Sequence, residues 1–120
     1  MRRRSRRRDG RGMVTAELAV STLTAFTLFL AMCWGIYLVI LQVRCIDTAS
    51  AVARQVARGD SAAAAHAKAN APRGSRVEVQ QRPDLVTVTV RLAAHPLGRG
   101  LVTVPLTAQA AVTPEPEGGT

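Results

Sequence analysis

The sequence is poor in the residues that build most catalytic and metal sites. It has two histidines, two cysteines, one tryptophan, one tyrosine and two phenylalanines among 120 residues. No CxxC motif or Cys/His cluster is present, which argues against a zinc or redox site. His66 and His95 fall in separate predicted elements, and no Ser/His/Asp, Cys/His or paired-carboxylate arrangement is visible. We therefore expect a protein that is not an enzyme and that uses no metal, cofactor or small-molecule substrate.

The two cysteines, Cys33 and Cys45, are too far apart to pair with each other on one helix. Their separation of twelve residues corresponds to about 18 Å, whereas a disulfide needs Cα atoms within about 7 Å. Cys33 falls within a long apolar run and is expected to pack there. Cys45 is interpreted as an inert thiol, with an intermolecular contact as the alternative.

Acidic residues are almost absent from the first twelve positions, which carry seven arginines and one aspartate. Residues 13–120 hold nine basic and seven acidic side chains, so most of the net charge of +8 belongs to this leader. Such a run could bind nucleic acid or anionic lipid, or hold its end in the cytoplasm. It has no interleaved aromatic residues for base stacking and directly precedes an apolar segment, which favours a topological role without nucleic acid. The arginines are Arg2, Arg3, Arg4, Arg6, Arg7, Arg8 and Arg11.

No charged residue occurs from Leu18 to Val43, a run of 26 residues. A membrane-spanning helix needs about 20. Trp34 and Tyr37 lie toward the far end, where aromatic residues favour the membrane interface, and Arg44 ends the run. The arginine run precedes it, so the pattern predicts a single-pass cell membrane protein in contact with lipid. Its N-terminus is expected in the cytoplasm and its C-terminal part outside.

Two export signals share parts of this pattern. A secretory signal also places basic residues before an apolar stretch, and Ala51-Val52-Ala53 resembles its A-x-A cleavage site. A twin-arginine signal shares the paired arginines. The apolar region of a secretory signal has only about 7 to 15 residues, so the longer run favours a membrane anchor.

Glu17 stands at the start of the apolar run, and Gly12 lies five positions before it, giving the form G-x-x-x-x-E. A charged side chain facing lipid costs about 2.5–3.5 kcal/mol at the bilayer centre and less near the boundary. Cleavage after Gly12 would give Met13 a free, positively charged amine one helical turn from Glu17 and on the same face. Alternatively, Glu17 is only a helix-start residue that the helix dipole favours.

Together the basic leader, Gly12, Glu17 and the apolar helix resemble the class III signals of type IV pilins. In that family a prepilin peptidase removes the leader at the cytoplasmic face, and the acid is thought to match the N-terminal amine of a neighbouring subunit. The resemblance implies cleavage between Gly12 and Met13 and an intersubunit charge pair at Glu17. It also implies three kinds of partner: a prepilin peptidase, other Tad pilins and the inner-membrane pilus assembly platform.

Further segments narrow the resemblance to TadE-like minor pilins of the actinobacterial type. They are the alanine- and arginine-rich continuation over 44–60, the alternating segment 86–90 and the terminal Glu115-Pro116-Glu117. Leu18 replaces the tyrosine that follows the glutamate in major Flp pilins, which also lack a sizeable C-terminal domain. The resemblance implies a minor pilin or pseudopilin of a Tad/Flp (type IV) surface pilus, a structure used in cell adhesion. The alternative is a permanently anchored extracytoplasmic interaction domain that is not built into a filament.

Beyond the apolar run, helical spacing continues to Gly59, which predicts one helix over about 14–58 that projects from the membrane. A short second helix is expected over 61–70, capped by Asp60 or Ser61 and ended by Pro72. His66 on this helix is expected to face solvent.

From Gly74 onward the apolar period changes to two, which predicts three antiparallel strands. Turns are expected at 82–84 and 98–100. Because Pro105 cannot donate to a ladder, the third strand is expected to be an edge of the sheet, or its proline to face outward. The helix face through Ile46, Ala53 and Val56 is expected to cover the sheet. The alternating residues are Val77 and Val79; Val86, Val88, Val90 and Leu92; and Val102, Val104 and Leu106.

The expected fold class is therefore α+β and pilin-like. Residues 1–12 form a basic cytoplasmic leader, and 13–59 a transmembrane helix with its extramembrane extension. Residues 60–112 form a small domain of one helix and an antiparallel sheet, and 113–120 a disordered tail.

Overall fold

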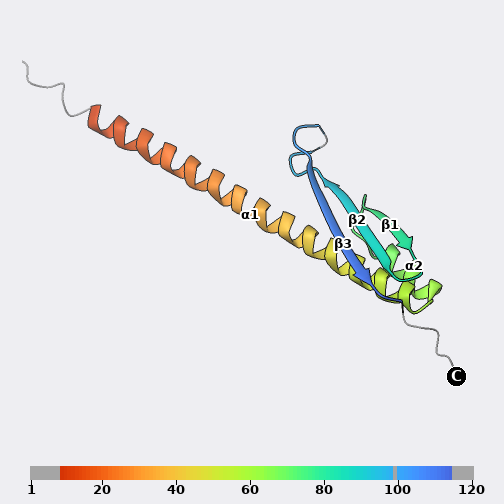
Figure 1. Ribbon diagram of the computed structural model, residues 1–120. Helices are drawn as coiled ribbons and strands as arrows, with labels where there is room; N and C mark the ends of the chain where they lie inside the picture. The colour runs from red at the N-terminus through yellow and green to blue at the C-terminus, as the bar shows by residue number, and fades with distance from the viewer. Residues whose placement is uncertain (1–8, 99, 115–120) are drawn as a thin grey trace, which may run out of the picture. The chain divides into compact units, whose positions relative to one another are not determined.

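In a computed structural model, which describes residues 9–98 and 100–114, the chain folds into two helices and a three-stranded antiparallel sheet (Figure 1). This confirms the α+β class, the long N-terminal helix, the short second helix and the three strands. The predicted leader arginines at positions 2–8 and the predicted tail from Glu115 onward lie outside the described residues. The elements are α1 (Asp9–Ala57), α2 (Ser61–Ala69), β1 (Arg76–Gln81), β2 (Val86–Ala94) and β3 (Val104–Val112).

The chain divides into two compact units, residues 1–36 and 37–120. In the first unit α1 starts at Asp9, earlier than the predicted start at about Val14. Within this unit the helix carries three threonines, Thr22, Thr24 and Thr27, whose hydroxyls each donate a 2.8 Å hydrogen bond to the carbonyl four residues earlier. These bonds satisfy the hydroxyl donors without a partner outside the helix, as an apolar environment requires.

The end of α1 and the start of α2 are both fixed by local capping. Gly59 has φ +74°, and its N–H donates to the Val56 carbonyl at 3.0 Å. The Asp60 N–H donates to the Gln55 carbonyl at 3.0 Å, which completes a Schellman motif. Asp60 then caps α2, because its Oδ1 accepts a 2.9 Å hydrogen bond from the Ala63 N–H. Of the two predicted caps, Asp60 is therefore the one used.

The sheet has the order β1-β2-β3, so that β2 lies in the centre. Pro105 pairs with Ala93 on the edge strand β3, as predicted. The predicted placement of Val102 in this strand is wrong: β3 begins at Val104, and Val102 is 45% exposed in the loop before it. The ladder ends at the pair of Ala94 and Val104, so the nine residues between them form the connection.

The second half of α1 covers one face of the sheet (Figure 1). Its contact residues recur at spacings of three and four, and two of them are alanines that allow the helix to approach closely. Ala53 and Val56 belong to this face, as predicted. The assignment of Ile46 is wrong, since Ile46 is 47% exposed and Cys45, one residue earlier, is fully buried. The buried core consists of Cys45, Ala49, Val52, Ala53, Val86, Val88, Val90, Leu92 and Ala108.

Candidate functional site

The first candidate site is the start of α1, where Gly12, Met13 and Glu17 lie on one exposed helical stretch. Met13 is 70% exposed, and a Cβ added at Gly12 would meet no atom beyond its own helical backbone within 4 Å. Five residues of helix place Glu17 about 7.5 Å along the axis from Gly12. Met13 and Glu17 are four residues apart and share a face, so an amine created at Met13 would be a neighbour of this carboxylate.

The rest of this unit presents an apolar surface that no part of the unit covers. From Gly12 to Ile36 every residue is exposed except Trp34, which is half-buried. Within the described residues, α1 is long and apolar enough to cross a membrane, and an 18-residue window within it has a mean hydropathy of 2.1. Signal sequences near an N-terminus share these properties. The large exposed side chains include Leu18, Val20, Leu23, Phe26, Leu28, Phe29, Leu30 and Met32.

The apolar run from Leu18 to Val43 begins on the exposed part of α1 and ends within the second unit. Leu41 packs against the sheet core, and the Gln42 Nε2 donates a 3.0 Å hydrogen bond to the Thr107 carbonyl. Residues from Leu41 onward therefore belong to the folded outer unit. The segment left for a bilayer is Leu18–Ile40, about 34 Å long, which still exceeds the roughly 30 Å hydrocarbon thickness.

Cys45 is a core residue, whereas Cys33 lies on the exposed part of α1. Burial raises the pKa of the Cys45 thiol, and the nearby Arg44 charge lowers it by less. Less thiolate is therefore present at a given pH than for an exposed cysteine. This position supports the interpretation of Cys45 as an inert thiol, because an intermolecular bond would require it to leave the core.

We expect Cys45 in a Cys33→Ser variant to react with iodoacetamide at least about a hundredfold more slowly in the folded protein than in guanidinium chloride, because burial removes both access and thiolate. The matched control is Gln80→Cys, on exposed β1, in a Cys33→Ser/Cys45→Ala background, which should react at similar rates in both conditions. Adduct formation followed by mass spectrometry measures both. Equal rates for folded and unfolded Cys45 would contradict the buried assignment.

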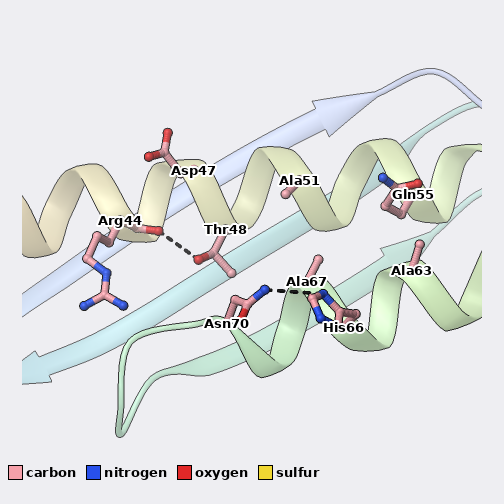
Figure 2. Close-up of a pocket in the computed structure, with 9 residues that line it drawn as sticks. All are labelled: Arg44, Asp47, Thr48, Ala51, Gln55, Ala63, His66, Ala67 and Asn70. Carbon is pink, nitrogen blue, oxygen red and sulfur yellow. Dashed lines mark hydrogen bonds between the residues drawn. The ribbon is translucent and has the colours of Figure 1, made fainter.

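A second candidate site is an open hollow between α1 and α2 (Figure 2). This hollow has a volume of about 660 Å³, and none of the predicted site residues that the structure describes lines it. Two of its polar contacts are local: the Thr48 hydroxyl donates to the Arg44 carbonyl at 2.8 Å, and the amide nitrogen of Asn70 is 3.4 Å from His66 Nδ1. His66 is exposed, as predicted.

A third hollow, of about 580 Å³, lies between the end of β2 and the first residues of α1 in the second unit. It brings Tyr37 and Leu41 of α1 together with Ala94 and His95 at the end of β2. No sequence pattern predicted this site, because it depends on which end of the sheet packs beside Tyr37.

Comparison with known proteins gives one informative relative. Over 103 residues, 84% of this chain and 77% of the relative, the sequence is 40% identical to the Mycobacterium tuberculosis protein named apoptosis inhibitor Rv3655c. No model of a known protein family matches the sequence, and no solved structure matches it. The aligned length exceeds that of either unit, so the similarity extends into both.

Proposed function

This chain belongs to the family of the Mycobacterium tuberculosis protein named apoptosis inhibitor Rv3655c, and from its own residues we propose that it is a TadE-type minor pilin or pseudopilin. In this proposal a prepilin peptidase removes the leader after Gly12. The protein then contributes to assembly of a Tad/Flp (type IV) surface pilus together with other Tad pilins and the inner-membrane assembly platform.

The observation that carries the proposal is a carboxylate at the start of an unpartnered apolar helix. Glu17 is exposed, and the apolar residues that follow it have no cover within their unit. In a bilayer such a carboxylate is costly unless a positive group lies beside it. Cleavage after Gly12 supplies an amine at Met13, and helices that pack side by side can offer that amine to the Glu17 of a neighbour.

The topology follows from the distribution of charge. The leader arginines hold the N-terminus in the cytoplasm, and the uncharged segment Leu18–Ile40 crosses the membrane. The folded part from Leu41 onward then lies outside the membrane, where its sheet and α2 are available to neighbouring subunits.

The second candidate is an anchored outer domain that is not built into a filament. The name of the relative refers to inhibition of apoptosis, an activity that does not require a pilus. In that case Gly12 is not cut, and the outer unit binds its partner from the membrane surface. The two candidates differ in the fate of the leader and in where the protein is found.

Shearing surface filaments from cells and comparing them with the membrane fraction separates the candidates. We expect the protein in the sheared filaments, or a marked loss of filaments when its gene is deleted, and both effects should require the prepilin peptidase. An unrelated single-pass membrane protein serves as the control for membrane contamination. Recovery only in membranes, with filament number unchanged by the deletion, would support the anchored domain instead.

A further inference from the structure

The outer unit carries an exposed apolar patch on the connection between β2 and β3. Leu97 is 60% exposed, Leu101 77% and Val102 45%. All three lie within six residues of a loop. The packing of a sheet face or a helix therefore does not account for their apolar side chains. Exposed apolar side chains that gather on one surface can mark a site of contact with a protein or a membrane.

This loop lies at the end of the outer unit that holds Tyr37, the first residue of that unit. Ala94, the last residue of β2, and His95, the first residue of the loop, line one hollow together with Tyr37 and Leu41. The turn between β1 and β2 lies at the opposite end, where Gln81 lines a hollow with Val56 and Gly59. Figure 1 shows β2 and β3 running beside the second half of α1 between these two ends.

The loop is also long enough to reach the membrane surface. Gln42 bonds the Thr107 carbonyl, which places these two residues at the same level. From Thr107 back to Val104 the strand rises about 10 Å, whereas the helix from Gln42 back to Tyr37 rises about 7.5 Å. The strand end is therefore level with Tyr37, an interfacial aromatic residue, and the loop extends from there.

The base of the loop is held by hydrogen bonds. The Thr103 hydroxyl lies 3.3 Å from His95 Nδ1, and the Gly98 N–H donates to the His95 carbonyl at 3.4 Å. Gly98 and Gly100 have φ values of +89° and +112°, which let the chain reverse between the two leucines.

Basic residues line the hollow beneath this loop. Arg44, Arg73 and His95 contribute to it, and none of the described residues that line it is acidic. Two arginines beside an aromatic residue at a membrane surface match the phosphate groups of anionic lipids.

We propose that the loop residues 95–98 and 100–103 form a lipid-contact site. Leu97, Leu101 and Val102 enter the bilayer interface, and Arg44 and Arg73 bind the phosphate of an anionic phospholipid in the adjacent hollow. The site ties the outer domain to the bilayer that α1 crosses. It requires α1 to span a membrane, but neither leader cleavage nor incorporation into a pilus.

A depth-sensitive fluorophore on the full chain in lipid nanodiscs tests the apolar contact. The probe is attached at Leu101→Cys in a Cys33→Ser background, and the control probe is at Asp84→Cys in the opposite turn. We expect the emission at position 101 to shift to the blue and to be quenched severalfold more by doxyl-labelled lipid than at position 84. Equal, water-like emission at both positions would overturn the proposal. So would a blue shift that lipid does not quench and that grows with protein concentration, because it would identify a second copy as the cover.

Lipid selectivity tests the basic hollow. The association of spin-labelled phosphatidylglycerol relative to phosphatidylcholine should fall about fivefold for each arginine replaced in Arg44→Gln and Arg73→Gln. The matched control Arg82→Gln, in the opposite turn, should leave the ratio unchanged, and added inorganic phosphate should not alter it. Unchanged selectivity in both variants would overturn the phosphate contact. Neither result depends on whether Gly12 is cut, so failure here is distinct from failure of the pilin proposal.

Discussion

Replacing Glu17 with glutamine is expected to lower the amount of this protein recovered in pili at least about tenfold, while leader removal and membrane insertion continue. A tenfold loss corresponds to about 1.4 kcal/mol, less than the cost of removing one partner from a buried charge pair. The neutral amide cannot attract the Met13 amine of a neighbouring subunit within the low-dielectric helix bundle. Quantitative immunoblots of sheared filaments and membranes, together with intact mass, measure both parts.

Insertion should not depend on Glu17, because the apolar length and the arginine run determine topology, and the amide makes the helix more apolar. Glu78→Gln is the matched control, since Glu78 is an exposed carboxylate on β1 in the outer unit. Pairing of Glu17 with the amine of its own helix is the rival explanation. Crosslinking to the other pilins in the membrane distinguishes the two. A Glu17→Gln protein that crosslinks and assembles like the wild type would show that Glu17 has no intersubunit role.

The second large effect is expected at the cleavage position, where Gly12→Leu should abolish leader removal and Gly12→Ala should leave partial processing. A peptidase pocket at a membrane surface that accepts glycine leaves little room for a branched side chain. The structure makes this test informative, because a side chain at Gly12 meets no atom beyond its own helical backbone within 4 Å. Failure to process the leucine variant would therefore report on the peptidase and not on misfolding of the chain.

Gly10→Leu provides the control for this experiment, since it adds the same side chain two residues before the proposed cut. It should be processed like the wild type in cells that contain the peptidase. Normal processing of Gly12→Leu would remove the argument that the glycine determines the cleavage position.

Sequence patterns predicted the elements of this fold better than their packing. The alternation from Val86 to Leu92 identified the central strand, and Pro105 identified an edge strand, because a residue without an N–H cannot join two ladders. The predicted contact face of α1 was wrong at Ile46. Ile46 lies three residues before Ala49, a spacing that a residue on the contact face could also have. In a helix rich in alanine several faces are equally small, and only the approach of the sheet selects the one through Cys45 and Val52.

The candidate sites also differ in how far the sequence could predict them. Gly12, Met13 and Glu17 are adjacent along one helix, so their spacing in the sequence was enough to predict that they share an exposed stretch. The hollow that brings Arg44 and Arg73 near His95 joins three separated segments. No local spacing could predict it, and Val102 was assigned to a strand because its alternation with Val104 continues past the point where pairing ends.

The central claim is that this chain is a processed pilin subunit, and the intact mass of the protein recovered from membranes tests it most directly. Cells that contain the prepilin peptidase should yield a mature chain that begins at Met13, and cells that lack it should yield the full-length chain. The proposal would be contradicted by the full-length chain alone in the presence of an active peptidase.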